Sequence, residues 1–367
     1  MRRIRVLIVD DSTVIRRLLS DTLSSDPELE VIGTAPNGRI ALAKIAQINP
    51  DLLTLDMEMP EMDGIATLVE LRKTYPKLPV VMFSTLTQRG AESTLDALSK
   101  GANDYVTKPA NVGSITAALQ NVRNELIPKI KGLCAWSKPA PTAAKPVGSS
   151  MAVGSNRLRP AVPSRIDIVT IGVSTGGPNA LLKVLSSLPE SFPVPIVLVQ
   201  HMPPIFTKHL ADRLNQVCKL RVHEAKAGDV LHPGGVWIAP GDYHLILERQ
   251  QATVRLNIHQ GPPENSCRPA VDVLFRSVVE LYGRGTLGVI MTGMGQDGLR
   301  GCEAIRDAGG TILIQDEASS VVWGMPAAVS HAGLANHVAS LDNIAAEIIR
   351  LTQQGRPTRT LPKEIGA

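Results

Sequence analysis

Short apolar runs alternate with helical stretches along nearly the whole chain, and this alternation limits the possible folds more than any other feature. In the first 130 residues we read five buried strands, which lie at residues 4–9, 31–34, 51–56, 79–85 and 104–109. Strands that are separated by helical segments form parallel sheets with helices packed on them. The pattern therefore predicts an α/β domain over residues 1–130, with a five-stranded parallel sheet of the (βα)5 type.

The second half of the chain repeats the alternation with one interruption. Helical segments again separate the strand patterns, which lie at residues 168–173, 195–199, 286–291 and 311–314. Between them, turn residues join three short strands at residues 236–240, 243–247 and 253–258, which is typical of antiparallel pairing. We predict a second domain over residues 166–355, a mostly parallel, doubly wound α/β domain of the hydrolase type with an antiparallel excursion. The length of 367 residues also favours two domains.

Residues 131–165 separate the two predicted domains and differ from them in composition. They are rich in Pro, Ala, Ser and Gly, and the prolines exclude a continuous helix. Because this segment contains several Lys and Arg residues and no acid, it accounts for the net charge of +4, and the rest of the chain is close to neutral. We predict a flexible linker and no nucleic-acid partner.

Cysteine spacing and hydropathy favour a cytoplasmic location. The four cysteines have no spacing that is typical of a zinc or redox motif, so we expect reduced thiols. Asp10 and Asp11 interrupt the first apolar run too early for a signal peptide. No stretch approaches the ~20 apolar residues of a membrane span. We expect a soluble protein without direct membrane insertion.

Charged and hydroxyl side chains follow four strands of the first domain. Asp10 and Asp11 follow the first strand, and the third, fourth and fifth strands end near Asp56, Ser84 and Lys108. The carboxyl ends of parallel strands meet at one edge, where α/β proteins bind ligands. Clustered carboxylates repel one another unless a hard cation such as Mg²⁺ lies among them, and a lysine and a hydroxyl suit a phosphoryl group. Each residue alone could be a turn residue, but together they predict a magnesium and phosphoryl site.

This set resembles the receiver domain of two-component response regulators over residues 3–125. The residues that carry the resemblance are Asp10, Asp11, Asp56, Ser84, Tyr105 and Lys108-Pro109. It implies that Asp56 accepts a phosphoryl group from a chemotaxis histidine kinase. Asp10, Asp11 and Asp56 would hold Mg²⁺. Lys108 would contact the phosphoryl oxygens. Ser84 and Tyr105 would relay the phosphorylated state to the far face of the domain.

In the second domain, residues 168–178 predict a strand, a tight turn and the start of a helix. The turn, Gly172-x-Ser174-x-Gly176, has the spacing of a nucleophile elbow, although such turns also serve as phosphate cradles or plain turns. Two other strands end near His201 and near the glycine loop that contains Asp297. A serine nucleophile needs a base, and a histidine base needs an acceptor that orients it. The order Ser…His…Asp differs from that of α/β-hydrolases, so the turn alone does not establish that fold.

Four motifs resemble the catalytic domain of chemotaxis methylesterases of the CheB type over residues 166–350. They are Gly-Val-Ser174-Thr-Gly-Gly, Gln-His201-Met-Pro-Pro, Arg268-Pro-Ala-Val-Asp-Val-Leu-Phe and Thr-Gly-Met294-Gly-Gln-Asp297-Gly. The resemblance implies demethylation of glutamyl methyl esters, and deamidation of glutamines, on methyl-accepting chemoreceptors. Ser174 would be the nucleophile, His201 the base and Asp297 its orienting acid. The Met294 backbone N–H would bind the oxyanion, and this site would need no cofactor.

Two alternatives remain open at this stage. A receiver domain can precede a nucleic-acid-binding output domain, but the second half contains no compact helix-turn-helix pattern and no basic helix. A nucleotide-binding turn at residues 172–178 would need a Walker lysine or a Gly-x-Gly-x-x-Gly pattern, and neither follows. Because one chain joins a phosphoacceptor to a hydrolase site, we also expect the unphosphorylated receiver domain to repress the enzyme.

Overall fold

The first half of the chain folds as a five-stranded α/β unit. The computed structural model describes residues 2–108, 115–134 and 165–356. The elements of the first unit are β1 (Ile4–Val9), α1 (Thr13–Ser24), β2 (Leu29–Ala35), α2 (Gly38–Ile48), β3 (Leu52–Asp56), α3 (Gly64–Thr74), β4 (Val80–Ser84), α4 (Gln88–Ser99), β5 (Asp104–Thr107) and α5 (Ile115–Cys134). Its strands are parallel and lie in the order β2-β1-β3-β4-β5. The predicted parallel sheet is confirmed.

Helices cover both faces of this sheet because successive strand residues point to opposite sides. Ile45, Leu68 and Leu95, from α2, α3 and α4, belong to one buried apolar cluster. Leu19 and Leu126, from α1 and α5, belong to a second cluster on the other face. Polar N-caps start the helices soon after the strands end. The carboxyl edge of the sheet therefore stays accessible.

Helix α5 corrects the predicted start of the linker. The helix continues to Cys134, so residues 131–134 are helical rather than part of the linker that we expected from residue 131. Ile130 and Leu133 are buried in an apolar cluster that also includes Val322 of the second unit. This burial favours the helix in spite of Pro128 inside it. Most of the predicted linker, and Pro109, lie outside the described residues.

The second unit is a larger parallel α/β structure. Its elements are β6 (Ile168–Val173), α6 (Gly177–Ser186), β7 (Ile196–Gln200), α7 (Phe206–Val217), β8 (Arg221–Glu224), β9 (Gly235–Ile238), β10 (His244–Gln250), β11 (Thr253–His259), α8 (Val271–Tyr282), the 3₁₀ turn η2 (Gly283–Gly285), β12 (Thr286–Ile290), α9 (Leu299–Asp307), β13 (Thr311–Gln315), α10 (Met325–His331), β14 (His337–Ala339) and α11 (Leu341–Gln353). The main sheet has the order β14-β13-β12-β6-β7-β9-β8 and is parallel throughout.

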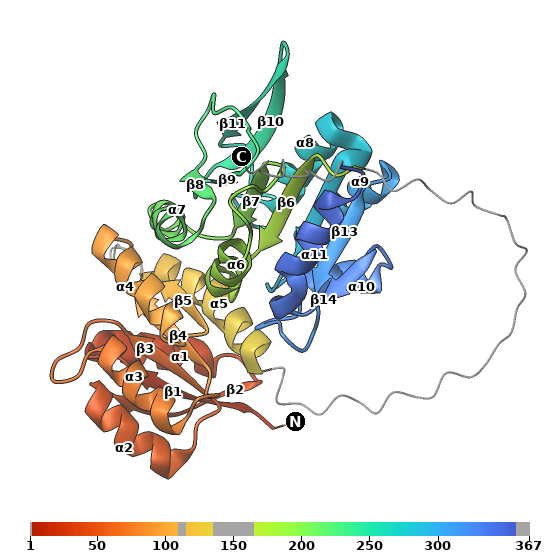
Figure 1. The fold of residues 1–367 in the computed structure, drawn as a ribbon. Helices are drawn as coiled ribbons and strands as arrows, with labels where there is room; N and C mark the ends of the chain where they lie inside the picture. The colour runs from red at the N-terminus through yellow and green to blue at the C-terminus, as the bar shows by residue number, and fades with distance from the viewer. Residues whose placement is uncertain (1, 109–114, 135–164, 357–367) are drawn as a thin grey trace, which may run out of the picture.

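The antiparallel excursion is smaller than we expected. Among the named strands of the described residues, β10 and β11 form the one antiparallel pair, and this hairpin projects away from the first unit (Figure 1). The first of the three strands expected there, β9, instead lies in the main sheet, parallel to β7. Val236 and Ile238 are fully buried, so the apolar core, rather than the neighbouring turns, determines where this strand pairs. The short elements β8, α10 and β14 were not anticipated.

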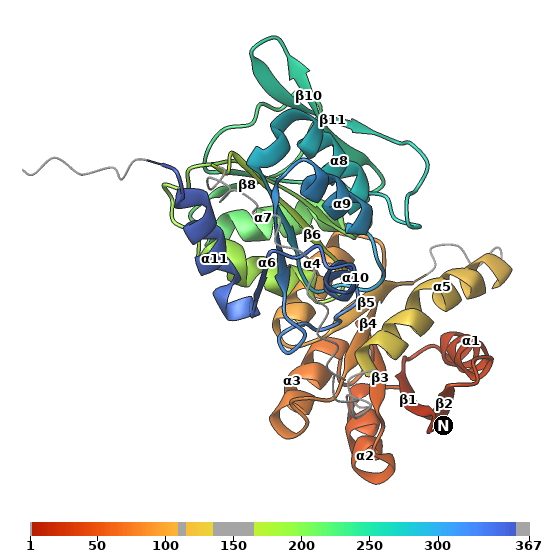
Figure 2. The same cartoon turned by 90° about the vertical axis from the view of Figure 1, so that its right-hand side faces the viewer.

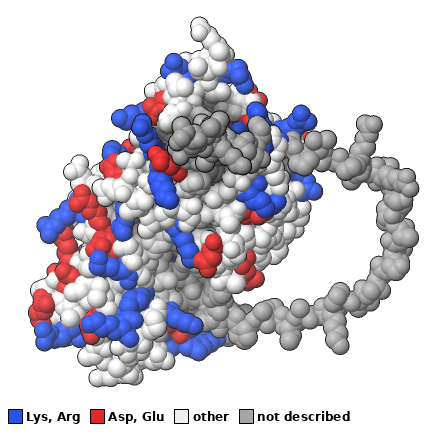
Figure 3. Space-filling view, viewed as in Figure 1, with Lys and Arg blue, Asp and Glu red and all other residues white. Residues whose placement is uncertain are grey.

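The two units pack against each other through β5, α4 and the end of α5 of the first unit, which face the second unit (Figures 1 and 2). The side-chain amide of Asn179, in α6, donates a hydrogen bond of 2.7 Å to the backbone oxygen of Leu98, in α4. Lys, Arg, Asp and Glu side chains are interspersed on the face that Figure 3 shows. Within the described ranges, no helix combines the length and apolar character needed to cross a membrane.

Candidate active site and phosphoryl site

The registers of three adjacent strands determine the site in the second unit. Strand β6 lies between β7 and β12. Val173 at the end of β6 is paired with Gln200 at the end of β7, so the next residues, Ser174 and His201, leave the sheet side by side. The backbone N–H of His201 donates to the oxygen of Val173 at 3.2 Å. The structure thus brings the predicted serine and histidine to one edge.

The loop after β12 approaches the serine turn closely. The Ser174 N–H donates to the backbone oxygen of Thr292 at 3.0 Å. A Cβ atom on Gly293 would lie 2.8 Å from the Cβ of Ser174, so only glycine allows this approach. Met294 and Gly295 follow and line the same cavity as Ser174. The predicted oxyanion donor, the N–H of Met294, therefore belongs to a loop that lies beside the serine.

Asp297 is held by hydrogen bonds on both carboxylate oxygens. Oδ2 lies 2.8 Å from Nε2 of His201 and accepts the N–H of Val271 at 2.7 Å. Oδ1 accepts the N–H of Asp272 at 3.0 Å and the side-chain amide of Asn265 at 3.0 Å. The N–H groups of Val271 and Asp272 are the first of α8, where the helix dipole favours a negative charge. Asp297 is thus oriented before any substrate arrives.

The pKa values of the Asp297–His201 pair move apart. Burial raises the pKa of Asp297, but the hydrogen bonds from His201 and from the start of α8 outweigh it, and the net pKa is lowered. Burial lowers the pKa of His201, yet the bonds to Asp297 and Cys267 outweigh it and raise the pKa above its usual value of 6.5. Because an ionised carboxylate only accepts, Nε2 of His201 must be the donor. In the neutral imidazole, Nδ1 then carries the free lone pair.

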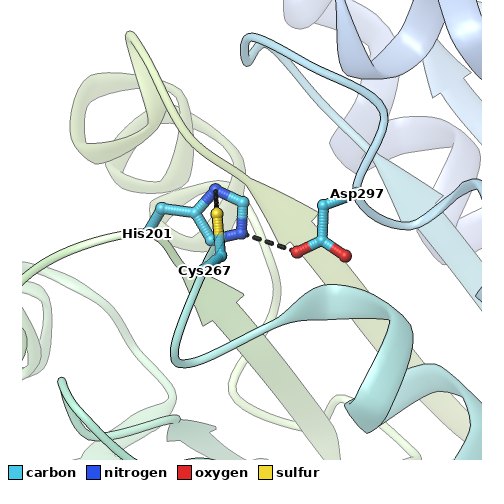
Figure 4. A group of neighbouring side chains, drawn as sticks. All are labelled: His201, Cys267 and Asp297. Carbon is cyan, nitrogen blue, oxygen red and sulfur yellow. Dashed lines mark hydrogen bonds and ion pairs between the residues drawn. The ribbon is translucent and has the colours of Figure 1, made fainter. Parts of the chain in front are cut away.

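The free nitrogen of His201 faces Cys267. Sγ of Cys267 lies 3.7 Å from Nδ1, and Figure 4 shows this contact together with the bond to Asp297. Among the described residues, no hydrogen bond joins Nδ1 to the hydroxyl of Ser174. Hydrogen bonds of this kind are often long before substrate binds, so the role of Ser174 stays a prediction.

The cavity above Ser174 is shared by the two units. It has a volume of about 450 Å³, and its lining includes Ser174 and His201 on one side and Tyr105 and Lys129 of the first unit on the other. Thr175, next to the serine, donates a buried hydrogen bond of 2.7 Å to Oδ2 of Asp104. The ring of Tyr105 stacks on Phe206 of α7, with a centroid distance of 4.9 Å. Strand β5 of the first unit therefore contacts the active-site edge directly.

The carboxyl edge of the first unit collects the predicted acidic residues and the lysine. Nζ of Lys108 lies 2.7 Å from Oδ1 of Asp56 and 3.4 Å from Oδ2 of Asp10. Asp10 and Asp56 are buried, whereas Asp11 is exposed. One carboxylate oxygen of each of these three acids lies within 4.8 Å of the others. This is an acidic cluster typical of a magnesium site.

The surroundings of Asp56 favour the binding of a cation or a phosphoryl group to its carboxylate. Burial raises the pKa of Asp56 to about 6, and repulsion from Asp10 adds to the rise, while the hydrogen bond from Lys108 opposes it. Oδ2 of Asp56 is buried and accepts no hydrogen bond within the described ranges. A hard cation or a phosphoryl group that met this oxygen would relieve its desolvation. The residues present thus fit the predicted magnesium ion.

The two predicted switch residues occupy different places. The Oγ of Ser84 donates to the backbone oxygen of Gly90 at 3.1 Å, and Ser84 lines a cavity of about 380 Å³ with Asp56 and Lys108. Tyr105 does not line this cavity; it is 6% exposed and belongs to the contact with the second unit. Ser84 is therefore close to the phosphoryl site, and Tyr105 is close to the hydrolase site.

Sequence analysis missed three residues that lie beside the candidate catalytic residues. Asn265 bridges Asp297 and Asp272, with a bond of 2.9 Å to the second acid. Asp272 is buried and accepts the N–H of Gly301 at 2.7 Å. Cys267 contacts His201. Only Asp272 lies inside a quoted motif, while Asn265 and Cys267 belong to an irregular loop in which Asn265 has a φ of 52°. Their roles depend on this loop conformation, which no periodic pattern indicates.

A hydrolase-type edge in one parallel unit and an acidic phosphoryl-type edge in the other define a response regulator with an enzymatic output domain. Comparison with known proteins makes this specific. The model of the CheB methylesterase family matches residues 169–348, and that of the response regulator receiver domain matches residues 6–120. The chain therefore belongs to the CheB family: it is a CheB-type protein-glutamate methylesterase/protein-glutamine glutaminase with a receiver domain.

Relatives and a solved structure support this assignment. A protein-glutamate methylesterase/protein-glutamine glutaminase from Trichodesmium erythraeum is 56% identical over 95% of this chain and 99% of its own. One of the same description from Nocardioides is 51% identical over 98% of each chain. The crystal structure of the Thermotoga maritima CheB methylesterase catalytic domain is 44% identical, with a TM-score of 0.50, and covers 51% of this chain and all of that domain.

Proposed function

We propose that the second unit, which we assign to residues 166–355, hydrolyses glutamyl methyl esters and deamidates glutamines on the cytoplasmic helices of methyl-accepting chemoreceptors. The observation that carries this proposal is the 2.8 Å bond between Nε2 of His201 and Asp297, beside the turn that holds Ser174. Such a pair is what converts a serine hydroxyl into a nucleophile. The reaction takes place in the cytoplasm, and the hydrolase site uses no cofactor.

The proton follows the tautomer that Asp297 imposes. The Oγ of Ser174 attacks the ester or amide carbonyl carbon while Nδ1 of His201 takes the hydroxyl proton. Asp297 stabilises the imidazolium through Nε2. When the tetrahedral intermediate collapses, Nδ1–H protonates the leaving group, which departs as methanol or ammonia. Water, deprotonated in turn by His201, then hydrolyses the acyl-enzyme to glutamate and free Ser174.

The N–H of Met294 supplies an oxyanion donor in this scheme. Gly293 lets the loop approach Ser174, so a donor two residues beyond Thr292 can reach the carbonyl oxygen as it becomes negative. One such donor contributes roughly 3–4 kcal/mol to transition-state stabilisation. Asn265 holds Asp297, and thereby His201, in place.

In the receiver domain, residues 1–130, we infer that Asp56 accepts a phosphoryl group from a chemotaxis histidine kinase. Asp10, Asp11 and Asp56 would hold Mg²⁺, which shields the charge of the incoming phosphoryl group. Lys108 is positioned to contact the phosphoryl oxygens once its bond to Asp56 is exchanged for them. A small phosphodonor with Mg²⁺ should label the wild type but not Asp56→Asn. Lys108→Arg should respond poorly, because a broad guanidinium does not replace a compact ammonium.

The shared cavity supports our expectation that the unphosphorylated receiver domain represses the enzyme. A receptor helix is about 10 Å wide, so it cannot reach Ser174 while β5 and α5 line the other side of the cavity. New contacts of Ser84 and Lys108 with a phosphoryl group would change the β4–β5 edge that carries Tyr105. The stacking of Tyr105 on Phe206, and the bond between Asp104 and Thr175, are the contacts that this change would weaken.

Mass spectrometry of receptor cytoplasmic fragments tests the proposed activity. Fragments that carry glutamyl methyl esters are incubated with the full-length protein, with and without a phosphodonor, and peptides are examined for loss of methyl groups and for conversion of glutamine to glutamate. We expect both products and faster formation with the phosphodonor. Unchanged peptides in both conditions would contradict the proposal.

A further inference from the structure

A cluster of three metal-ligand side chains lies in the hydrolase cavity. It consists of Cys267, His201 and Asp297, whose ligand atoms lie within 4.8 Å of one another. Cys267 and His201 are partly exposed and line the cavity together with Ser174. The hydrolysis proposed above uses His201 and Asp297 but assigns nothing to the thiol.

The spacing within the cluster suits a tetrahedral metal ion. In zinc sites the Zn–S distance is about 2.3 Å and the Zn–N distance about 2.0–2.1 Å, so a tetrahedral ion separates the sulfur and nitrogen by about 3.6 Å. Sγ of Cys267 and Nδ1 of His201 are 3.7 Å apart. The two atoms are therefore already at about the separation that one tetrahedral ion requires.

The surroundings prepare His201 as a metal ligand. Its Nε2 is bonded to Asp297 at 2.8 Å, which leaves the lone pair of the neutral ring on Nδ1, the nitrogen that faces the thiol (Figure 4). A carboxylate behind a ligating histidine is the usual second shell of protein zinc sites. The thiolate and imidazole select ions such as Zn²⁺, whereas Mg²⁺ prefers oxygen ligands and would remain with the receiver domain.

We propose that Cys267 and His201 form an inhibitory site for a thiophilic divalent cation of the Zn²⁺ type, with Asp297 as its outer-shell partner. On binding, the thiol proton and, where His201 is protonated, the proton on its Nδ1 leave to solvent, the thiolate and the Nδ1 lone pair bind the ion, and water fills its remaining positions. No oxidation or reduction is involved. Because the same lone pair takes the proton of Ser174, an occupied site stops hydrolysis. This last consequence rests on the proposed function, whereas binding itself does not.

Co²⁺ titration of the full-length protein under reducing conditions tests binding without any use of activity. A thiolate ligand produces a near-ultraviolet charge-transfer band that oxygen ligands, including the acidic cluster of the receiver domain, do not produce. We expect this band in the wild type, its loss in Cys267→Ser and in Cys267→Ala, and its displacement by Zn²⁺. Cys218→Ser is the matched control, because Cys218 is the other partly buried thiol among the described cysteines. Asp297→Asn should keep the band but weaken Co²⁺ binding by about 10–100-fold.

Inhibition is then measured with receptor fragments, and each variant is compared with its own rate in a metal-chelating buffer. Zn²⁺ should inhibit the wild type and Cys218→Ser reversibly, and Cys267→Ala should need at least about tenfold more Zn²⁺. Absence of a thiolate band in the wild type, or its persistence in folded Cys267→Ala, would overturn the site. A band that depends on Cys267 without inhibition would leave the metal site in place and overturn its inhibitory role. If no variant or wild type hydrolysed the fragments, the proposed function would fail while the Co²⁺ result stood.

Discussion

Asp56 and Asp297 are two buried carboxylates at the carboxyl edges of two parallel sheets, yet their electrostatics are opposite. They are 1% and 2% exposed, so burial does not distinguish them. Asp297 accepts backbone N–H groups from the start of α8 as well as a bond from His201, and its pKa is lowered. Asp56 has a bond from Lys108 but also faces Asp10, and its pKa is raised to about 6.

The difference shows that the number of donors, rather than burial, decides what a carboxylate at a strand end can do. An acid whose oxygens are all bonded keeps its charge and its orientation, which suits a residue that positions a histidine. An acid with a buried oxygen that accepts no bond is unstable as a bare anion and gains from a cation or an electrophile. The first arrangement suits the proposed role of Asp297, which acts through His201, and the second suits the proposed direct reaction of Asp56.

The largest expected effect concerns Ser174, the proposed nucleophile that His201 and Asp297 would activate. Ser174→Ala should lower kcat for receptor demethylation by about 10⁶-fold, because a nucleophile and its base act as one unit. A small-for-small change at a strand end should leave the unfolding temperature unchanged, which calorimetry checks. Near-normal turnover would show that Ser174 is not the nucleophile. The contrast between Asp297 and Asp56 would then have no bearing on catalysis.

The next test replaces Asp297, the acid whose carboxylate oxygens both accept hydrogen bonds. Asp297→Asn should lower kcat by about 10⁴-fold, because an amide that donates to Nε2 favours the wrong tautomer of His201. In the wild type, kcat/KM should rise with pH as His201 loses its proton at a pKa above 6.5. Measured pH–rate profiles for methyl release check both statements. A rising limb below pH 6 in the wild type would contradict the proposed effect of Asp297 on His201.

A smaller effect should follow when the receiver domain is removed from the second unit. A fragment of residues 160–367 should demethylate receptors faster than the unphosphorylated full-length protein, by up to about 100-fold if 99% of the chains are docked. Phosphorylation should accelerate the full-length protein and leave the fragment unchanged. If the bare fragment is no faster, steric repression is wrong, and the receiver domain must activate the enzyme directly or recruit its substrate.

The smallest expected effect is on stability and concerns Asp56, whose buried Oδ2 accepts no hydrogen bond within the described ranges. The pKa of Asp56 is about 6 in the folded protein against an ordinary value of 3.8, so the folded state holds this proton more tightly than the unfolded state. Its contribution to stability therefore decreases as pH rises through the window between these values, by at most ~3 kcal/mol. Calorimetry in chelating buffer at pH 4.5 and 7 should show a steeper loss for the wild type than for Asp56→Asn. Equal losses would show that folding does not raise the pKa of Asp56.

The sequence predicted the edges of both sheets better than the contacts between residues. Strand ends can be read from apolar runs, so Asp56, Ser174 and His201 could be assigned to the correct edges. The pairing of β9 was wrong because a short strand between turns does not reveal whether its neighbour is parallel or antiparallel. Asn265 and Cys267 could not be found, because a loop without periodicity places them beside Asp297 and His201. The contact of Tyr105 with Phe206 joins residues far apart in the chain, which no local pattern encodes.

The shared cavity gives the enzyme a threshold of substrate size. A space of about 450 Å³ between β5, α5 and the serine turn accommodates a single glutamyl methyl ester side chain on a short peptide. It excludes an entire helix. If the receiver domain represses the enzyme as we propose, it selects substrates by size rather than by blocking the serine itself. We then expect short esters to be hydrolysed with or without phosphorylation, whereas hydrolysis of an intact receptor helix should require the separation of Tyr105 from Phe206.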